Sequence, residues 1–109
     1  MSGTFQIKRG DTSPGIKYEL LPSDINLSGA TVRFQMQSLS RQTIIDAPAV
    51  IEQTTAPPIV SYAWTSGDTE KAGNYRAEFR VEYADGSIET FPNKGFINLK
   101  INPDVQDLP

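Results

Sequence analysis

The segment "NYRAEFRVEY", residues 74–83, alternates strictly between apolar and polar side chains. A period of two over this length predicts a β-strand with one face in a core and the other in water. The apolar face of this strand carries Tyr75, Ala77, Phe79, Val81 and Tyr83. The segment therefore predicts a fold built on a half-buried sheet.

The rest of the chain repeats this pattern in shorter pieces. The Asp85-Gly86 pair predicts a two-residue hairpin turn, because such turns need positive φ. The "IETF" that follows returns antiparallel, so residues 75–91 are expected to form a hairpin. Further strands are expected at residues 4–8, 16–21, 31–37, about 44–51, 59–64 and 96–101.

No window shows a helical period longer than about one turn. Residues 66–73 have room for that turn, with Asp68 as its cap and Gly73 at its end. Short strands at regular spacing predict an all-β fold, an immunoglobulin-like antiparallel β-sandwich of about 7–9 strands. At this length we expect a single domain, residues 1–109, with its core at about 4–102 and a loose tail at 103–109.

Composition excludes several classes of function. The chain has no cysteine and no histidine, which removes disulfides, thiol nucleophiles and the commonest general base and metal ligand. The formal net charge is −3, and Lys and Arg are scattered, so we expect no nucleic-acid partner. No apolar run approaches the ~20 residues of a membrane span, so no membrane partner is expected either.

Paired carboxylates are the remaining candidates for catalysis. Glu78 and Glu82 lie on one strand face, but Arg76 and Arg80 alternate with them, which favours a cross-strand charge ladder over acid–base chemistry. No glycine-rich phosphate loop, nucleophile elbow or calcium loop is present. The sequence therefore predicts a protein that is not an enzyme and that has no cofactor, no metal and no small-molecule substrate.

The segment "WTSGDTEKAGNYRAEF" resembles the corner between strands E and F of immunoglobulin-like domains. In that corner an Asp precedes a turn, and a Tyr sends its hydroxyl back to the upstream backbone. Asp68 and Tyr75 occupy these places, and the spacing of Gly73 fits. The alternative is that Tyr75 is only a core aromatic. Trp64 is expected to pack in the core or corner, with a ligand platform as its alternative.

A longer series of blocks extends the resemblance to nearly the whole chain. The blocks are "FQIKRGDT", "NLSGATVRFQM" and "VSYAWTSGDTEKAGNYRAEFRVEYADGSIETFPNKGFINLKI". In this order they look like the N-terminal domain of phage baseplate upper proteins, over residues 4–102. The chain departs from that pattern at "TTAPPIV", where a glycine-containing turn is usual, and the sequence stops at Pro109, where baseplate members continue into a stalk.

This resemblance implies a non-enzymatic structural protein of a phage or prophage particle, located in the virion after assembly in the bacterial cytoplasm. The mechanism expected is docking onto other virion proteins, in a homo-oligomer or ring. The alternatives are a head decoration or connector subunit, a module that binds host-surface carbohydrate or protein, and an immunoglobulin-like adhesion domain. The Arg9-Gly10-Asp11 tripeptide is the motif that adhesion receptors recognise, but a β-turn explains it better, because Gly10 supplies positive φ and Asp11 can hydrogen-bond the backbone two residues on.

The segment "TFPNKGF" predicts the docking surface. Pro92 cannot donate to a sheet ladder and Gly95 permits a bulge, so the strand is expected to break after Phe91. Phe96 and Asn98 are expected to face outward beside Phe91 and Pro92. The alternative is that Phe96 folds back over the end of the sandwich.

Overall fold

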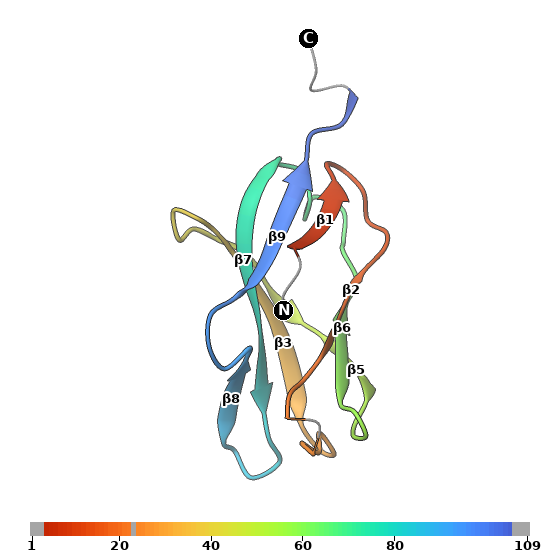
Figure 1. Ribbon diagram of the computed structural model, residues 1–109, viewed down its shortest axis with the longest axis vertical. Helices are drawn as coiled ribbons and strands as arrows, with labels where there is room; N and C mark the ends of the chain where they lie inside the picture. Colours follow the sequence, from red (N-terminus) through yellow and green to blue (C-terminus); the bar gives the residue numbers. More distant parts are fainter. Residues whose placement is uncertain (1–3, 23, 106–109) are drawn as a thin grey trace.

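The computed structural model describes residues 4–22 and 24–105. These residues form two facing sheets (Figure 1). The strands are β1 (Thr4–Lys8), β2 (Ile16–Glu19), β3 (Thr31–Ser38), β4 (Thr43–Pro48), β5 (Val50–Gln53), β6 (Ile59–Tyr62), β7 (Gly73–Glu82), β8 (Ile88–Phe91) and β9 (Ile97–Asn102).

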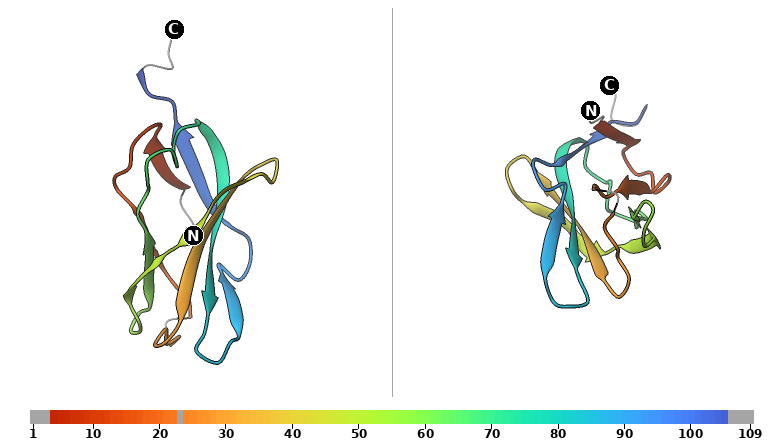
Figure 2. Two further views of the ribbon diagram at one scale, coloured as in Figure 1. Left: turned by 180° about the vertical axis from the view of Figure 1, so that it is seen from behind. Right: turned by 60° about the horizontal axis from the view of Figure 1, so that its bottom comes forward.

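The larger sheet, sheet A, has the order β1-β9-β7-β3-β4, and β8 also pairs with β7. The smaller one, sheet B, has the order β2-β6-β5. The predicted all-β sandwich is confirmed, and Figure 2 shows its two layers from behind and from below. The sandwich is not wholly antiparallel, because β1 runs parallel to β9, with Thr4 opposite Asn98 and Lys8 opposite Asn102.

The long amphipathic strand β7 organises sheet A. One edge of β7 pairs with the whole length of β3, from Ser38 opposite Tyr75 to Thr31 opposite Glu82. Its other edge is shared, since β9 covers residues 73–77 and β8 covers residues 79–82. The strands β8 and β9 are therefore one interrupted strand, as the Pro92–Gly95 segment predicted, and Gly95 has a φ of +76°.

The strand expected at about 44–51 is divided between the two sheets. Its first part, β4, belongs to sheet A, and its second part, β5, belongs to sheet B. The crossing occurs at Ala49, whose N–H donates to the carbonyl of Val32 at 2.8 Å. Pro48, which has no N–H to donate, ends β4 just before the crossing.

Two predicted turns differ from the structure. The hairpin after β7 has a three-residue loop, since Tyr83 N–H donates to the Ser87 carbonyl and Gly86 N–H to the Tyr83 carbonyl. Within this loop only Gly86 has positive φ, whereas the type I′ two-residue turn that an Asp-Gly pair favours needs it at both central positions. Residues 66–69 form a hydrogen-bonded turn and no helix, because Asp68 N–H bonds the Thr65 carbonyl and the pattern does not continue.

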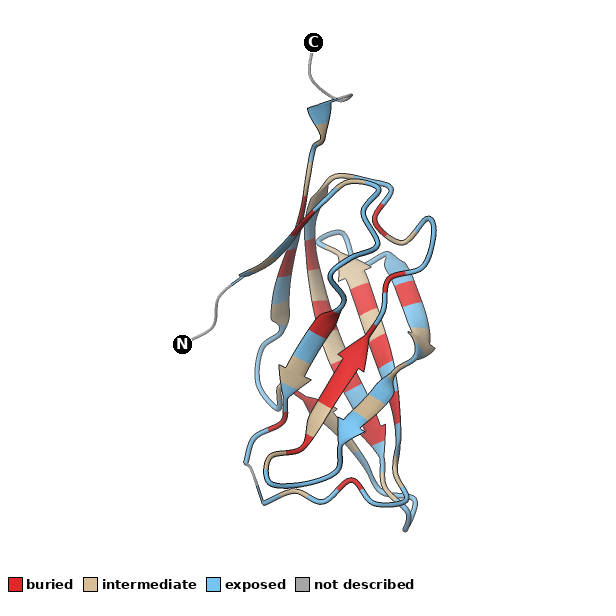
Figure 3. Cartoon of the chain, turned by 90° about the vertical axis from the view of Figure 1, so that its right-hand side faces the viewer, coloured by how far each residue is buried: buried red, intermediate tan, exposed pale blue. Residues whose placement is uncertain are grey.

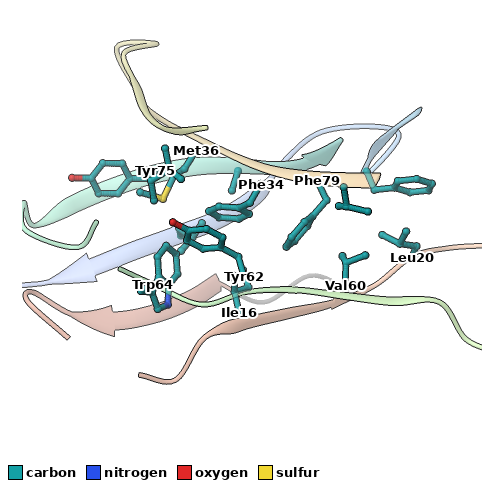
Figure 4. Packing of buried hydrophobic residues seen from close by; sticks show 14 of the residues in the cluster. Ile16, Leu20, Phe34, Met36, Val60, Tyr62, Trp64, Tyr75 and Phe79 are labelled. Atoms are coloured by element: carbon teal, nitrogen blue, oxygen red, sulfur yellow. The ribbon is translucent and has the colours of Figure 1, made fainter. Parts of the chain in front are cut away.

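The core lies between the sheets, and its centre is aromatic (Figure 4). Phe34 is fully buried, with its ring centroid 4.7 Å from Tyr62 and 5.1 Å from Phe79. Such offset and tilted pairs are favourable beyond the area they bury. Buried and exposed residues alternate along the strands (Figure 3). The other large buried side chains are Ile7, Ile16, Leu20, Leu27, Val32, Met36, Ile45, Val60, Trp64, Tyr75, Val81, Phe91, Leu99 and Ile101.

The chain leaves the sandwich after β9. Asp104 is still tied to the body, because the Arg9 guanidinium lies 3.3 Å from its carboxylate, whereas Val105 is 79% exposed. Residues 106–109 of the predicted loose tail lie outside the described residues. In the described part of the chain, no helix is long and apolar enough to cross a membrane.

Candidate docking surface and the corner that supports the sheets

Tyr75 closes the corner that leads into β7. Its hydroxyl donates to the Lys71 backbone carbonyl at 2.5 Å, which is the hydrogen bond that a tyrosine corner requires. Its ring is buried, and burial raises the pKa of the Tyr75 hydroxyl. Gly73 lies beside this ring with a φ of +152°, and a Cβ there would stand 3.7 Å from the ring. The corner therefore fixes the point where the chain enters sheet A.

Asp68 joins the same corner to sheet B. Its Oδ2 accepts hydrogen bonds from the Tyr62 hydroxyl at 2.6 Å, from Thr65 N–H at 2.8 Å and from the Thr65 hydroxyl at 3.0 Å. Burial, and then the hydrogen bond and charge of Asp68, raise the pKa of Tyr62 to about 12. Asp68 therefore closes a turn backward onto Thr65 and does not cap a helix.

Trp64 is a core residue and not a ligand platform. Its side chain is 5% exposed and packs edge-on against Phe34 and Tyr62. The indole N–H donates to the Pro14 carbonyl at 2.9 Å, which ties the loop between β1 and β2 to the core.

The sequence Gly-Asp-Thr occurs twice, at residues 10–12 and 67–69, and the second copy holds the first turn of the chain. Gly10 has a φ of +86°, as the turn interpretation predicted, and its N–H donates to the Thr69 carbonyl at 3.0 Å. The buried Thr69 hydroxyl donates to the Asp11 carbonyl at 2.7 Å. Arg9 is engaged by Asp104. These contacts give the tripeptide a structural role in the turn.

One predicted docking residue is misplaced. Phe91 is 1% exposed and belongs to the core, so the expectation that it forms part of the docking surface is wrong. The reason is register: Phe91 lies directly opposite Phe79, and residues opposite each other in a sheet share a face. Pro92 is half-buried, whereas Phe96 and Asn98 are exposed as expected.

The other three predicted residues lie at one groove. It runs between β2 and the segment that joins β8 to β9, and its volume is about 720 Å³. This is within the range of roughly 300–1,000 Å³ that binding clefts span. Leu21 stands on the rim of the groove, 64% exposed. The residues that line the groove are Phe5, Ile16, Lys17, Tyr18, Glu19, Leu21, Pro92, Lys94, Gly95, Phe96, Ile97 and Asn98.

Sequence reasoning did not find the β2 side of this groove. A signal was present in "ELLP", because consecutive residues of an extended chain point to opposite sides. Leu20 is fully buried, so its neighbour Leu21 is directed outward. That the outward side meets the β8–β9 segment depends on tertiary packing, which no local pattern encodes.

Phe96 does not fold over the end of the sandwich. Its ring is 44% exposed, and the Arg76 guanidinium carbon lies 5.2 Å from the ring centroid. Arg76 comes from the outer face of sheet A, so a cation–π contact holds Phe96 against that face. The aromatic ring therefore stands between the groove and the outside of sheet A.

The outer face of sheet A also has a polar hollow of about 270 Å³. The predicted charge ladder is not formed there, because none of the four residues Arg76, Glu78, Arg80 and Glu82 makes an ion pair within the described part of the chain. Arg80 lies opposite Arg33, which instead pairs with Asp46 at 2.9 Å. The residues that line the hollow are Gln35, Met36, Gln37, Thr43, Asp46, Arg76, Glu78 and Phe96.

Among the described residues, no three acidic side chains gather closely enough to hold a metal ion. No buried side-chain nitrogen or oxygen in this part of the chain lacks a hydrogen-bond partner. The buried polar groups are therefore satisfied within the fold, and the groove is the largest of the hollows described above.

No family model and no curated protein sequence matches this chain. Among solved structures, the chain is similar to the crystal structure of CopC from Methylosinus trichosporium OB3b, with a TM-score of 0.53 and 14% sequence identity. The similarity covers 94% of this chain and 86% of that one. At this identity the likeness shows a shared β-sandwich fold and carries no information about a ligand.

Proposed function

We propose that this chain is a non-enzymatic structural protein of a phage or prophage particle, of the tail or baseplate type, which acts by docking onto a neighbouring virion protein. The observation that carries the proposal is the groove beside β2, where Leu21, Phe96 and Pro92 interrupt a polar surface. An exposed apolar groove rimmed by polar side chains is typical of an interaction site.

Two further observations support docking over chemistry. The ordered blocks of sequence that resemble baseplate upper proteins run across residues 4–102 and include the docking segment "TFPNKGF". The charged residues that line the groove are Lys17, Glu19 and Lys94, and no ion pair joins them within the described part of the chain, so no base is positioned against a nucleophile as covalent catalysis requires. A ring or other homo-oligomer in the particle fits the same proposal.

The test is the composition of purified particles. Phage particles from a bacterium that carries this gene are banded by density and analysed by mass spectrometry. We expect the chain to co-purify with tail proteins at a constant ratio through successive purification steps. A chain that remains in the soluble cell fraction and is lost from the particles would refute the proposal. A chain found on tailless heads would instead assign it to a decoration or connector subunit.

A second candidate function is the binding of host-surface carbohydrate, and the hollow on sheet A favours it. A half-exposed aromatic ring, Phe96, lies there beside the amides of Gln35 and Gln37, and such groups recognise the faces and hydroxyls of sugars. A glycan array decides this candidate. Binding to one class of glycan that Gln35→Ala and Gln37→Ala abolish would support it, and no binding would reject it.

A further inference from the structure

The two sheets are unequal in a way that leaves one side of the sandwich open. Within residues 4–22 and 24–105, sheet A has six strands and sheet B has three. On the side where β2 faces β1 and β9, the hydrophobic residues Phe5, Tyr18 and Ile97 are only partly buried and line the groove. A further strand beside β2 would cover them.

The backbone of β2 has an edge to which such a strand could pair. In the described part of the chain β2 pairs with β6 alone, so its other edge faces the groove. Leu20 N–H donates to the Pro58 carbonyl on the β6 side. The backbone N–H and C=O groups of successive residues point alternately to the two edges of a strand. Because those of Leu20 point toward β6, those of Lys17 and Glu19 point away from it.

The β2 edge is short and carries the charged residues Lys17 and Glu19, but it lacks the proline and the register shift that mark the edge strands β4 and β5. Pro48 ends the edge strand β4, and register shifts interrupt both the β3–β4 and the β5–β6 pairs. In contrast, β2 contains no proline and its register with β6 is regular. It is therefore an edge without these blocks and with an apolar groove alongside.

We infer that the groove receives an extended segment of the neighbouring virion protein, which adds to β2 as a fourth strand of sheet B. This inference rests on the proposed docking function and names its mode. Alternate side chains of the segment would be apolar and cover Tyr18 and Phe5. Those between them would be acidic, because Lys17 and Lys94 on the rim outnumber Glu19.

The experiment uses the full chain and defined peptides. The probe is a blocked peptide of about eight residues, an ordinary strand length, with valine at alternate positions and glutamate between. The matched peptide has lysine in place of glutamate. Binding and amide hydrogen exchange are followed by NMR. We expect the acidic peptide to bind below about 1 mM and the basic peptide at least about tenfold more weakly.

The decisive readout is protection of two amides. Strand addition slows hydrogen exchange at Lys17 and Glu19, whose N–H groups face the groove, and leaves Tyr18 as protected as before. Glu19→Pro removes one of these donors without removing a β2–β6 hydrogen bond, so it should abolish binding while the melting temperature changes little. If that variant unfolds, Lys17→Glu with Lys94→Glu serves instead and should reverse the preference between the peptides.

Failure of this inference and failure of the proposed function are distinguishable. No binding of the acidic peptide, or binding without protection at Lys17 and Glu19, overturns strand addition even if the chain is found in particles. A chain absent from particles overturns the virion role, while protection of both amides still establishes β2 as an edge that accepts a strand.

Discussion

The Tyr75 hydroxyl donates a hydrogen bond of 2.5 Å to the backbone carbonyl of Lys71, four residues upstream. Tyr75→Phe keeps the buried ring and leaves that carbonyl without its donor, so the free energy of unfolding should fall by about 1–2 kcal/mol. Urea denaturation measures this. Tyr18→Phe is the control, since the Tyr18 hydroxyl has no hydrogen bond in the described part of the chain and its loss should cost under about 0.5 kcal/mol. Equal effects of the two substitutions would show that Tyr75 is merely a core ring.

Asp68 accepts three hydrogen bonds. Its removal should therefore lower the free energy of unfolding by more than the loss of an uncharged hydrogen-bond partner would. Asp68→Ala should lower the free energy of unfolding by about 2–3 kcal/mol, because charged acceptors form stronger hydrogen bonds. Combining it with Tyr62→Phe should cost less than the sum of the single substitutions, since both remove the same hydrogen bond. Strict additivity in the denaturation curves would contradict this coupling.

Stability should decline at alkaline pH. Burial and the carboxylates of Asp68 and Glu89 raise the pKa values of Tyr62 and Tyr83 to about 12. In the unfolded chain tyrosine has a pKa of about 10. The folded state therefore favours the protonated phenols, a contribution that is complete below about pH 10 and is lost as pH rises toward 12. Near-ultraviolet absorbance should show few phenolates in the folded protein at about pH 10. Half-ionised tyrosines at that pH would contradict the assignment.

Gly10 tests the turn that carries the Arg-Gly-Asp tripeptide. Its φ is +86°, and no heavy atom lies within 4 Å of the position of a Cβ, so a side chain there adds backbone strain and no clash. Gly10→Ala should destabilise by about 1–2 kcal/mol, and Gly10→Asn by less, because Asn tolerates this conformation. Thermal unfolding ranks the natural protein and the two variants by stability. Equal stability of the Ala and Asn variants would argue against backbone strain at this position.

The strands and the corner were predictable because their signals are local. A period of two fixes which side of β7 is buried, and the spacing of Asp68, Gly73 and Tyr75 marks the turn before it. The position of the break after Phe91 was predictable for the same reason, since Pro92 lacks a donor.

The side of the sheet on which the Phe91 side chain lies was not predictable, because it depends on the pairing of Phe91 with Phe79 across the hairpin. A three-residue loop in place of a two-residue loop shifts that pairing by one residue, which reverses every side chain of β8. The groove was missed for a related reason. It brings β2 together with the β8–β9 segment, which lies far away along the chain.

If the groove beside β2 docks this chain into a particle, as proposed, the exposed ring of Phe96 should be an anchor of that contact. Phe96→Glu should leave stability within about 1 kcal/mol, since the side chain is half exposed and glutamate can approach Arg76. Ile88→Glu, at an exposed position outside the groove, is the matched control.

The measurement is the amount of each variant in purified particles, made in cells that lack the natural gene and supply the variant. We expect Ile88→Glu to be incorporated like the natural chain and Phe96→Glu to be reduced at least about tenfold, as for an anchor residue of an interface. Incorporation of a folded Phe96→Glu protein at the natural level would contradict docking through this groove.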